Sequence, residues 1–83
     1  MMKIETELLD ALFCTESAAR ISVLHYSFFP VMKRNGQMNG MELDEYTTIF
    51  SNGGMVADRM WNELLARYRW CLDQEESYGT RAS

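Results

Sequence analysis

The apolar positions of residues 55–76 recur with the period of an α-helix. At about 100° per residue, nine apolar side chains fall on one half of a helical wheel, and only Arg67 lies at the edge of that half. The opposite half is polar apart from Ala66 and Trp70. The pattern therefore predicts a long amphipathic helix over 55–76, followed by a flexible polar tail over 77–83.

A second helical pattern begins near the N-terminus. Apolar side chains share one face of its first half, with Leu9 and Phe13 widening that face: Ile4, Leu8, Ala11 and Leu12. Residues 18–29 are apolar nearly all round, as in a helix that is deeply buried or covered by another chain. We therefore predict one helix over 4–28. We expect Pro30 to end it, because the residue before a proline disfavours the α conformation.

The same region also admits a β-strand. The run ISVLHYSFF is rich in β-branched and aromatic residues, and the Asn-Gly steps at 35–36 and 39–40 can form hairpin turns. An α+β fold with a hairpin in residues 21–41 is thus an alternative. We prefer the helix because the run contains adjacent apolar pairs, which break the alternation of a half-buried strand.

Residues 41–50 predict a third, short helix, and the following Ser-Asn-Gly-Gly sequence predicts its end and the start of the last helix. The fold class expected from these elements is all-α. We expect a single domain over residues 1–76, in which two long helices pack antiparallel and the short helix lies across them.

Composition and charge narrow the possible settings and partners. The chain has 83 residues, a net charge of −4 and two cysteines, too few for a disulfide scaffold. It shows neither a signal peptide nor a run of about 18 apolar residues that could cross a membrane. We expect a cytoplasmic protein that does not bind membranes. The acidic balance also argues against nucleic acid as the main partner.

The apolar half of the helix over 55–76 spans about 180°, wider than the stripe of about 100° that covers one side of a core. Two other helices in a small chain offer little to cover the excess. We therefore expect a homo-oligomer, in which both long helices contribute to a shared core. The residues expected to make this contact are apolar and come from both helices: Leu24, Phe28, Trp61, Leu65, Tyr68 and Leu72.

Trp70 is the clearest candidate for a binding residue, because a tryptophan on the polar side of a helix does not serve that helix's own core. Tryptophan and arginine are the residue types most enriched in protein-binding hot spots. The predicted protein-binding surface combines Trp70 with its helical neighbours: Arg59, Glu63, Ala66 and Arg67. A contact between Trp70 and the chain's own N-terminus or tail is the alternative reading.

The sequence offers no catalytic constellation. His25 is the single histidine, and together with Cys14 and Cys71 it makes one ligand fewer than a closed structural zinc site needs. Neither a phosphate-binding glycine loop nor a nucleophile elbow occurs. We expect no enzyme activity, no cofactor and no metal.

The expected function is regulation or inhibition by binding another protein. A compact acidic chain with aromatic residues to spare resembles the accessory proteins of bacteriophages and prophages, such as antirepressors and inhibitors of host or defence proteins. The resemblance is one of general character and not of motif. The alternative is a DNA-binding or DNA-mimicking regulator, because two helices joined by a short turn at 51–54 also suggest a helix-turn-helix.

Overall fold

The computed structural model describes the backbone of residues 14–82 and the side chains of residues 14–77. The helical pattern expected for residues 4–13 lies outside this part. The single helix expected over residues 4–28 is wrong, because residues 14–16 are not helical and the first described helix begins at Ser17. The described chain forms five consecutive elements: α2 (Ser17–Val23), the π-helix η1 (Leu24–Phe28), α3 (Phe29–Arg34), α4 (Gly40–Asn52) and α5 (Gly54–Ala82). No strand occurs between residues 14 and 82, so the all-α class is confirmed and the hairpin in 21–41 is wrong.

Pro30 does not end the first helix, contrary to expectation. A proline inside an α-helix lacks the N–H for one hydrogen bond, and its ring clashes with the carbonyl four residues back. Here the π-helical turn η1 comes directly before it, and the Phe29 N–H donates to the Leu24 carbonyl, five residues back. The wider turn accommodates the ring, and helical structure therefore continues from Ser17 to Arg34.

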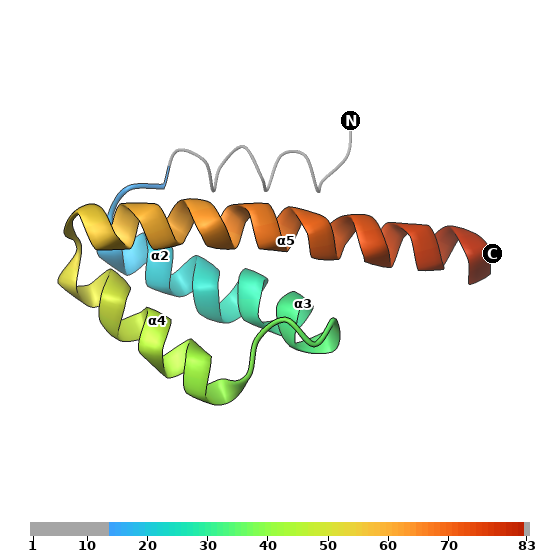
Figure 1. The fold of residues 1–83 in the computed structure, drawn as a ribbon, viewed down its shortest axis with the longest axis horizontal. Helices are drawn as coiled ribbons and strands as arrows, with labels where there is room; N and C mark the ends of the chain where they lie inside the picture. The colour runs from blue at the N-terminus through green and yellow to red at the C-terminus, as the bar shows by residue number, and fades with distance from the viewer. Residues whose placement is uncertain (1–13, 83) are drawn as a thin grey trace.

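The helices α2–α3 and α5 run parallel, not antiparallel as expected. Arg20 in α2 pairs with Asp58 near the start of α5, and Arg34 at the end of α3 pairs with Glu75 farther along α5. Figure 1 shows both helices running in the same direction, while α4 runs back in the opposite direction alongside them. The return is possible because α4, at 13 residues, spans about 20 Å rather than forming a short cross-piece.

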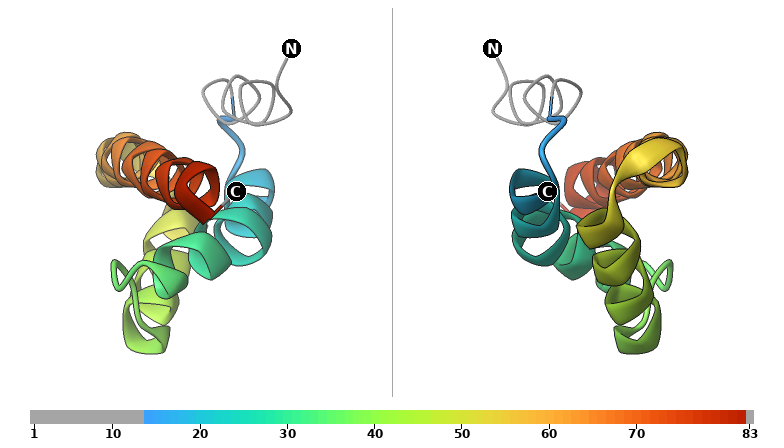
Figure 2. Two further views of the ribbon diagram at one scale, coloured as in Figure 1. Left: turned by 90° about the vertical axis from the view of Figure 1, so that its right-hand side faces the viewer. Right: turned by 90° about the vertical axis from the view of Figure 1, so that its left-hand side faces the viewer.

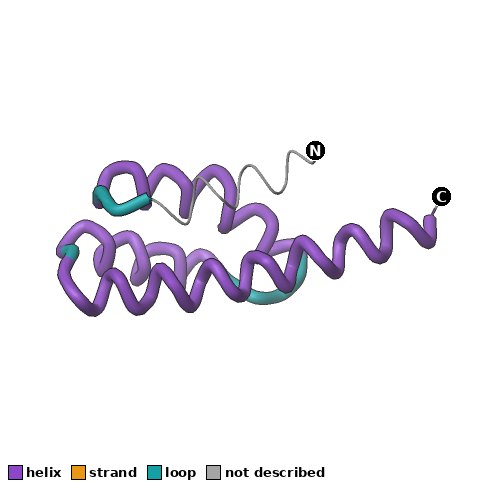
Figure 3. The backbone as a smooth tube through the Cα atoms, turned by 90° about the horizontal axis from the view of Figure 1, so that it is seen from above, coloured by secondary structure: helices purple, strands orange, loops and turns teal. Residues whose placement is uncertain are grey.

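Seen end-on, α5, α2–α3 and α4 occupy the three corners of a triangle (Figure 2). Two short connections join the described helices, one at residues 35–39 and one at Gly53 (Figure 3). Gly53 has a φ of 70°, so glycine supplies the left-handed conformation expected at this turn. α5 then continues to Ala82, beyond the end expected at Glu76, and the backbone of residues 77–82 is helical where a tail was predicted.

The start of α4 carries a capping box that our sequence analysis missed. The Glu42 N–H donates to the Asn39 side chain over 2.8 Å, and the Asn39 N–H donates back to the Glu42 carboxylate over 3.1 Å. The Asn-x-x-Glu spacing of residues 39–42 could have predicted this capping box from the sequence.

Aromatic side chains from three helices meet at the centre of the core. The Phe28 ring stacks on Trp61 with centroids 4.9 Å apart and contacts Tyr68 at 4.6 Å, while Phe50 meets Trp61 edge-on at 5.4 Å. Such pairs stabilise a core by about 0.5–1.5 kcal/mol beyond the burial of their area.

This core contains the residues that we expected to join two copies. Five of them are buried within one chain and the sixth packs against the cluster: Leu24, Phe28, Trp61, Leu65, Tyr68 and, half-buried, Leu72. Within one chain, the other helices and Met38 of the connection pack against the apolar half of α5.

Trp61→Ala should lower the free energy of unfolding by about 3–5 kcal/mol, because it removes the ring at the centre of the cluster. In so small a domain this loss is a large part of the total stability. Urea denaturation followed by circular dichroism measures it. Asn62→Ala, at the exposed neighbouring position, is the control and should change stability by less than about 0.5 kcal/mol; similar losses in both variants would contradict the central place of Trp61.

Candidate protein-binding face on α5

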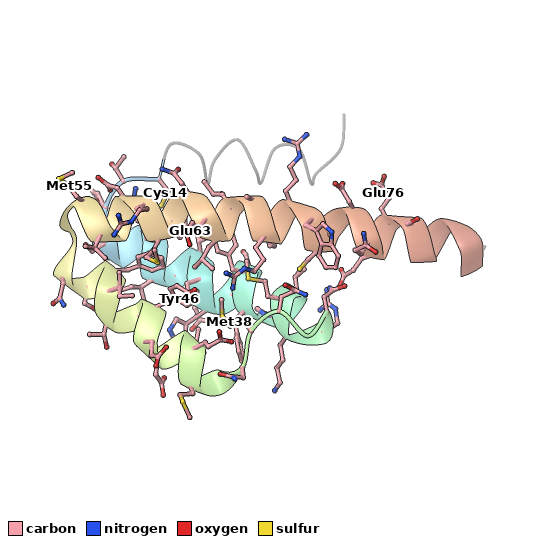
Figure 4. All side chains as sticks on the ribbon, in the orientation of Figure 1. Cys14, Met38, Tyr46, Met55, Glu63 and Glu76 are labelled. Carbon is pink, nitrogen blue, oxygen red and sulfur yellow. The ribbon has the colours of Figure 1, made fainter. Side chains whose placement is uncertain are left out.

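The side of α5 that points away from the core presents a tryptophan among charged and small residues. We call this the outer face and define it by four exposed side chains: Arg59, Glu63, Ala66 and Trp70. Trp70 is 48% exposed, in contrast to Trp61 at 1%. Figure 4 shows Glu63 on α5, and the spacing of three and four residues carries the same face along the helix. The structure thus places four of the five predicted binding residues on one surface.

Arg67 is the exception. It is half-buried, and its guanidinium lies 3.4 Å from the Gln37 carbonyl oxygen in the connection between α3 and α4. Arg67 therefore turns toward the body of the molecule, as its position at the edge of the helical wheel allows. Its charge still lies beside the outer face, but its side chain helps to hold the 35–39 connection.

The charges on the outer face are not used inside the described part of the chain. Neither Arg59 nor Glu63 forms an ion pair with another residue between 14 and 77, although their spacing of four residues permits one. Trp70 is likewise absent from the aromatic contacts of the core. An exposed indole beside unpaired charges of both signs is a surface that can bind by apolar contact and by ion pairs.

Arg20 fixes the start of α5 and was not anticipated as a structural residue. Only 7% of Arg20 is exposed. Its guanidinium donates to Asp58 over 2.8 Å and to the Cys14 carbonyl over 2.9 Å, and it lies 5.3 Å from the centre of the Trp61 ring. A buried cation needs such partners. Periodicity alone could not reveal this role, because it treats arginine as a surface residue.

A second ion pair holds the far part of α5. Arg34 donates two hydrogen bonds to the Glu75 carboxylate, each of 2.9 Å, and the Asn35 amide donates a third. The hydrogen bonds from Arg34 lower the pKa of Glu75 below its ordinary value, with a smaller contribution from Asn35. The two ion pairs lie 17 positions apart along α5 and so orient the outer face away from the body.

The remaining polar candidates have structural partners. His25 Nε2 lies 2.8 Å from the Thr47 hydroxyl, which itself donates to the Leu43 carbonyl. His25 therefore links η1 to α4. Cys14 and Cys71 are free thiols, and burial raises the pKa of each.

Neither a metal cluster nor a membrane span emerges from the described residues. In that part of the chain, no three side chains of the types that hold metals come together. None of its helices combines the length and the apolar character that crossing a membrane requires.

Comparisons with known proteins give no relative for this chain. No family model matches it, and neither the curated proteins nor the solved structures contain a significant match.

Arg20→Met should lower the free energy of unfolding by about 1.5–3 kcal/mol, because it removes hydrogen bonds made by a buried charge. Asp58→Asn should cost less than about 1 kcal/mol, because the Asp58 side chain is 66% exposed. Denaturation of both single variants and the double variant gives their coupling energy. A larger loss for Asp58→Asn would contradict the assignment of Arg20 as the anchor.

The Arg34–Glu75 pair should make stability depend on acid pH. Because folding lowers the pKa of Glu75, the pair stabilises the fold above the unfolded-state pKa, and this contribution is lost as pH falls through the folded-state pKa. Arg34→Gln should therefore cost about 0.2–1 kcal/mol near pH 7 and less near pH 3. Arg69→Gln, which removes an exposed charge, is the control; an Arg34→Gln loss that stays constant with pH would contradict the pairing.

Proposed function

We propose that this chain is a small non-enzymatic protein that regulates or inhibits another protein by binding it through the outer face of α5. The observation that carries the proposal is the exposure of Trp70 beside Ala66, Arg59 and Glu63 on a helix whose opposite side fills the core. Ala66 is small enough to admit a partner close to the helix backbone, and Trp70 offers a large rigid side chain.

The rigidity of α5 supports this use of its surface. Binding residues on an element that is already ordered lose less conformational freedom on association than residues on a loop. α5 is fixed at Asp58 by Arg20, at Trp61 by the aromatic cluster and at Glu75 by Arg34. A partner would therefore meet a surface already in its binding conformation.

We propose that the chain acts as an inhibitor of a host or defence protein, or as an antirepressor. Phages and prophages encode proteins of both kinds. Acting by occupying a partner's surface requires only a compact body and one binding face. The proposed partner is a protein that offers an apolar pocket for an indole and charges of both signs around it.

A DNA-binding or DNA-mimicking regulator is the second candidate, since α4, the turn at Gly53 and α5 follow one another as in a helix-turn-helix. The start of α5 would then have to read bases. It presents Met55 and Val56, which are exposed, and Asp58, which is engaged with Arg20. Arg59 is the one basic residue in its first two turns, so protein binding is better supported.

We also propose self-association, through residues other than those expected from the sequence. With the expected contact residues inside the core, an interface between copies would have to use exposed apolar side chains, of which Met55, Val56 and Trp70 lie on α5. Such an interface would compete with the proposed partner for the outer face.

Trp70→Ala should weaken partner binding by about 2 kcal/mol or more, roughly 30-fold, while leaving the melting temperature nearly unchanged. The partner is first captured from a bacterial lysate with the wild-type protein, and its affinity for purified variants is then measured by calorimetry. Tyr26→Ala is the matched control, because Tyr26 is an exposed aromatic residue on a different helix. Equal loss of binding in both variants, or a large loss of stability for Trp70→Ala, would remove the outer face as the binding site.

A further inference from the structure

Asparagine is followed directly by glycine at three places in the chain, at residues 35–36, 39–40 and 52–53. Such a step can modify itself, because glycine has no side chain to keep its backbone nitrogen away from the preceding asparagine amide. In this fold all three steps lie at helix ends: Asn35 follows α3, Asn39 precedes α4, and Asn52 is the last residue of α4. The hydrogen bonds around each step differ, and they determine which asparagine is free to react.

The reaction is a deamidation in two steps. The glycine nitrogen bonds to the asparagine Cγ atom, while the Cγ–Nδ2 bond breaks and the amide nitrogen leaves as ammonia with the proton of the glycine N–H. One water molecule then opens the cyclic imide at one of its two carbonyl carbons. Opening at Cγ gives aspartate, whereas opening at the main-chain carbonyl carbon gives isoaspartate, in which the chain runs through the former side chain. No oxidant or reductant takes part.

The step at Asn35 is held on both sides of the bond that would form. The Asn35 Nδ2 atom, which would have to leave, donates to the Val31 carbonyl over 2.8 Å and to the Glu75 carboxylate over 2.9 Å. The attacking nitrogen is also engaged, because the Gly36 N–H donates to the Lys33 carbonyl over 3.1 Å. Deamidation of Asn35 therefore requires several hydrogen bonds to break first.

The step at Asn52 is held through the backbone. The Gly53 N–H donates to the Ile49 carbonyl over 3.1 Å and so closes the last turn of α4. Gly53 cannot lose its amide proton to solvent while this bond is made. Deamidation of Asn52 therefore requires the end of α4 to open.

The step at Asn39 is open. Asn39 is exposed and extended, with a ψ of 176°. Gly40 begins α4, so its N–H is one of the four that have no partner within the helix, and no residue of the described part accepts a hydrogen bond from it. A methyl group built on Gly40 would meet nothing within 4 Å, so solvent reaches this end of the helix.

The cap of α4 also favours the chemistry at Asn39. The Glu42 N–H donates to the Asn39 Oδ1 atom over 2.8 Å, and attack on Cγ places negative charge on this oxygen. A donor that already points at the developing charge stabilises it. The positive end of the helix dipole likewise favours the anion that forms when the Gly40 N–H loses its proton. The bond that caps the helix is thus kept during the reaction.

We propose that Asn39 is a site of spontaneous deamidation, modified ahead of Asn35 and Asn52, and that its isoaspartate product loosens the start of α4. Isoaspartate adds one carbon to the main chain before Gly40, which removes the geometry of the capping box. The preceding residue, Met38, is buried in the core. The aspartate product keeps the cap, because aspartate and asparagine cap helices equally well. The modification acts on α4 and is independent of the outer face of α5.

Peptide mapping of the full chain by mass spectrometry tests the site. The folded protein is incubated at mildly alkaline pH, and the extent of deamidation at each asparagine is followed with time. Asn39 should react about five-fold or more faster than Asn35 or Asn52, because these two must first break additional hydrogen bonds. The chain unfolded in guanidinium chloride is the control, in which the three rates should converge. Equal rates in the folded chain would overturn the proposal.

Gly40→Ala is the matched variant. The space around Gly40 is open, so the fold should be retained, whereas the added methyl group hinders the attacking nitrogen. The rate at Asn39 should fall to that at Asn52 or below, with an unchanged circular dichroism spectrum. An unchanged rate at Asn39 would contradict the assignment of Gly40 as the attacking residue and with it the proposal.

The effect on α4 is tested by separating the isoaspartate form by chromatography and comparing it with the variant Asn39→Asp. Asn39→Asp should melt at the wild-type temperature, whereas the isoaspartate form should melt about 4 °C or more lower, because it loses the cap. Hydrogen exchange of the amides of residues 41–44 should be faster in the isoaspartate form, and that of residues 59–70 should not change. Equal melting temperatures and equal exchange in the two forms would show that the modification does not loosen α4.

Discussion

The fold depends on how a helix passes Pro30. In a regular α-helix, positions four residues apart drift by about 40° around the axis at each step. The π turn from Leu24 to Phe28 contains one residue more than an α-helical turn, and this offsets the drift. Side chains four residues apart therefore stay on one side of the helix. That row is the buried line of the first helix, comprising Arg20, Leu24, Phe28 and Met32. Through this row, Phe28 stacks on Trp61 and Arg20 pairs with Asp58 from the same side of the helix.

The continuous helix determines the rest of the architecture. Because α2–α3 runs past Pro30 to Arg34, it lies beside α5 from Asp58 to Glu75, and α4 must return the chain between their two ends. Three helices then surround the cluster of Phe28, Phe50 and Trp61. Residues 14–77 do not cover the opposite side of α5, which separates the residues that stabilise the fold from those proposed to bind.

Periodicity predicted the elements better than their arrangement. α4, α5 and the turn at Gly53 follow from local pattern and from glycine chemistry, and the positions of Trp61 in the core and Trp70 on the outside follow from a helical wheel. The continuation of the helix through Pro30 was not predicted, because a hydrophobic pattern does not distinguish a π turn from an α-helical turn. The parallel packing depends on Arg20 and Arg34, whose partners are 38 and 41 residues away and are invisible to a local pattern.

The most direct test of this account is the assignment of backbone chemical shifts of the isotope-labelled protein, together with amide hydrogen exchange. We expect helical shifts without interruption from Ser17 to Arg34 and a protected Phe29 amide, because this amide donates to the Leu24 carbonyl. Non-helical shifts at Phe28 and Phe29, with a rapidly exchanging Phe29 amide, would show that the helix ends before Pro30. The core as described here would then be wrong.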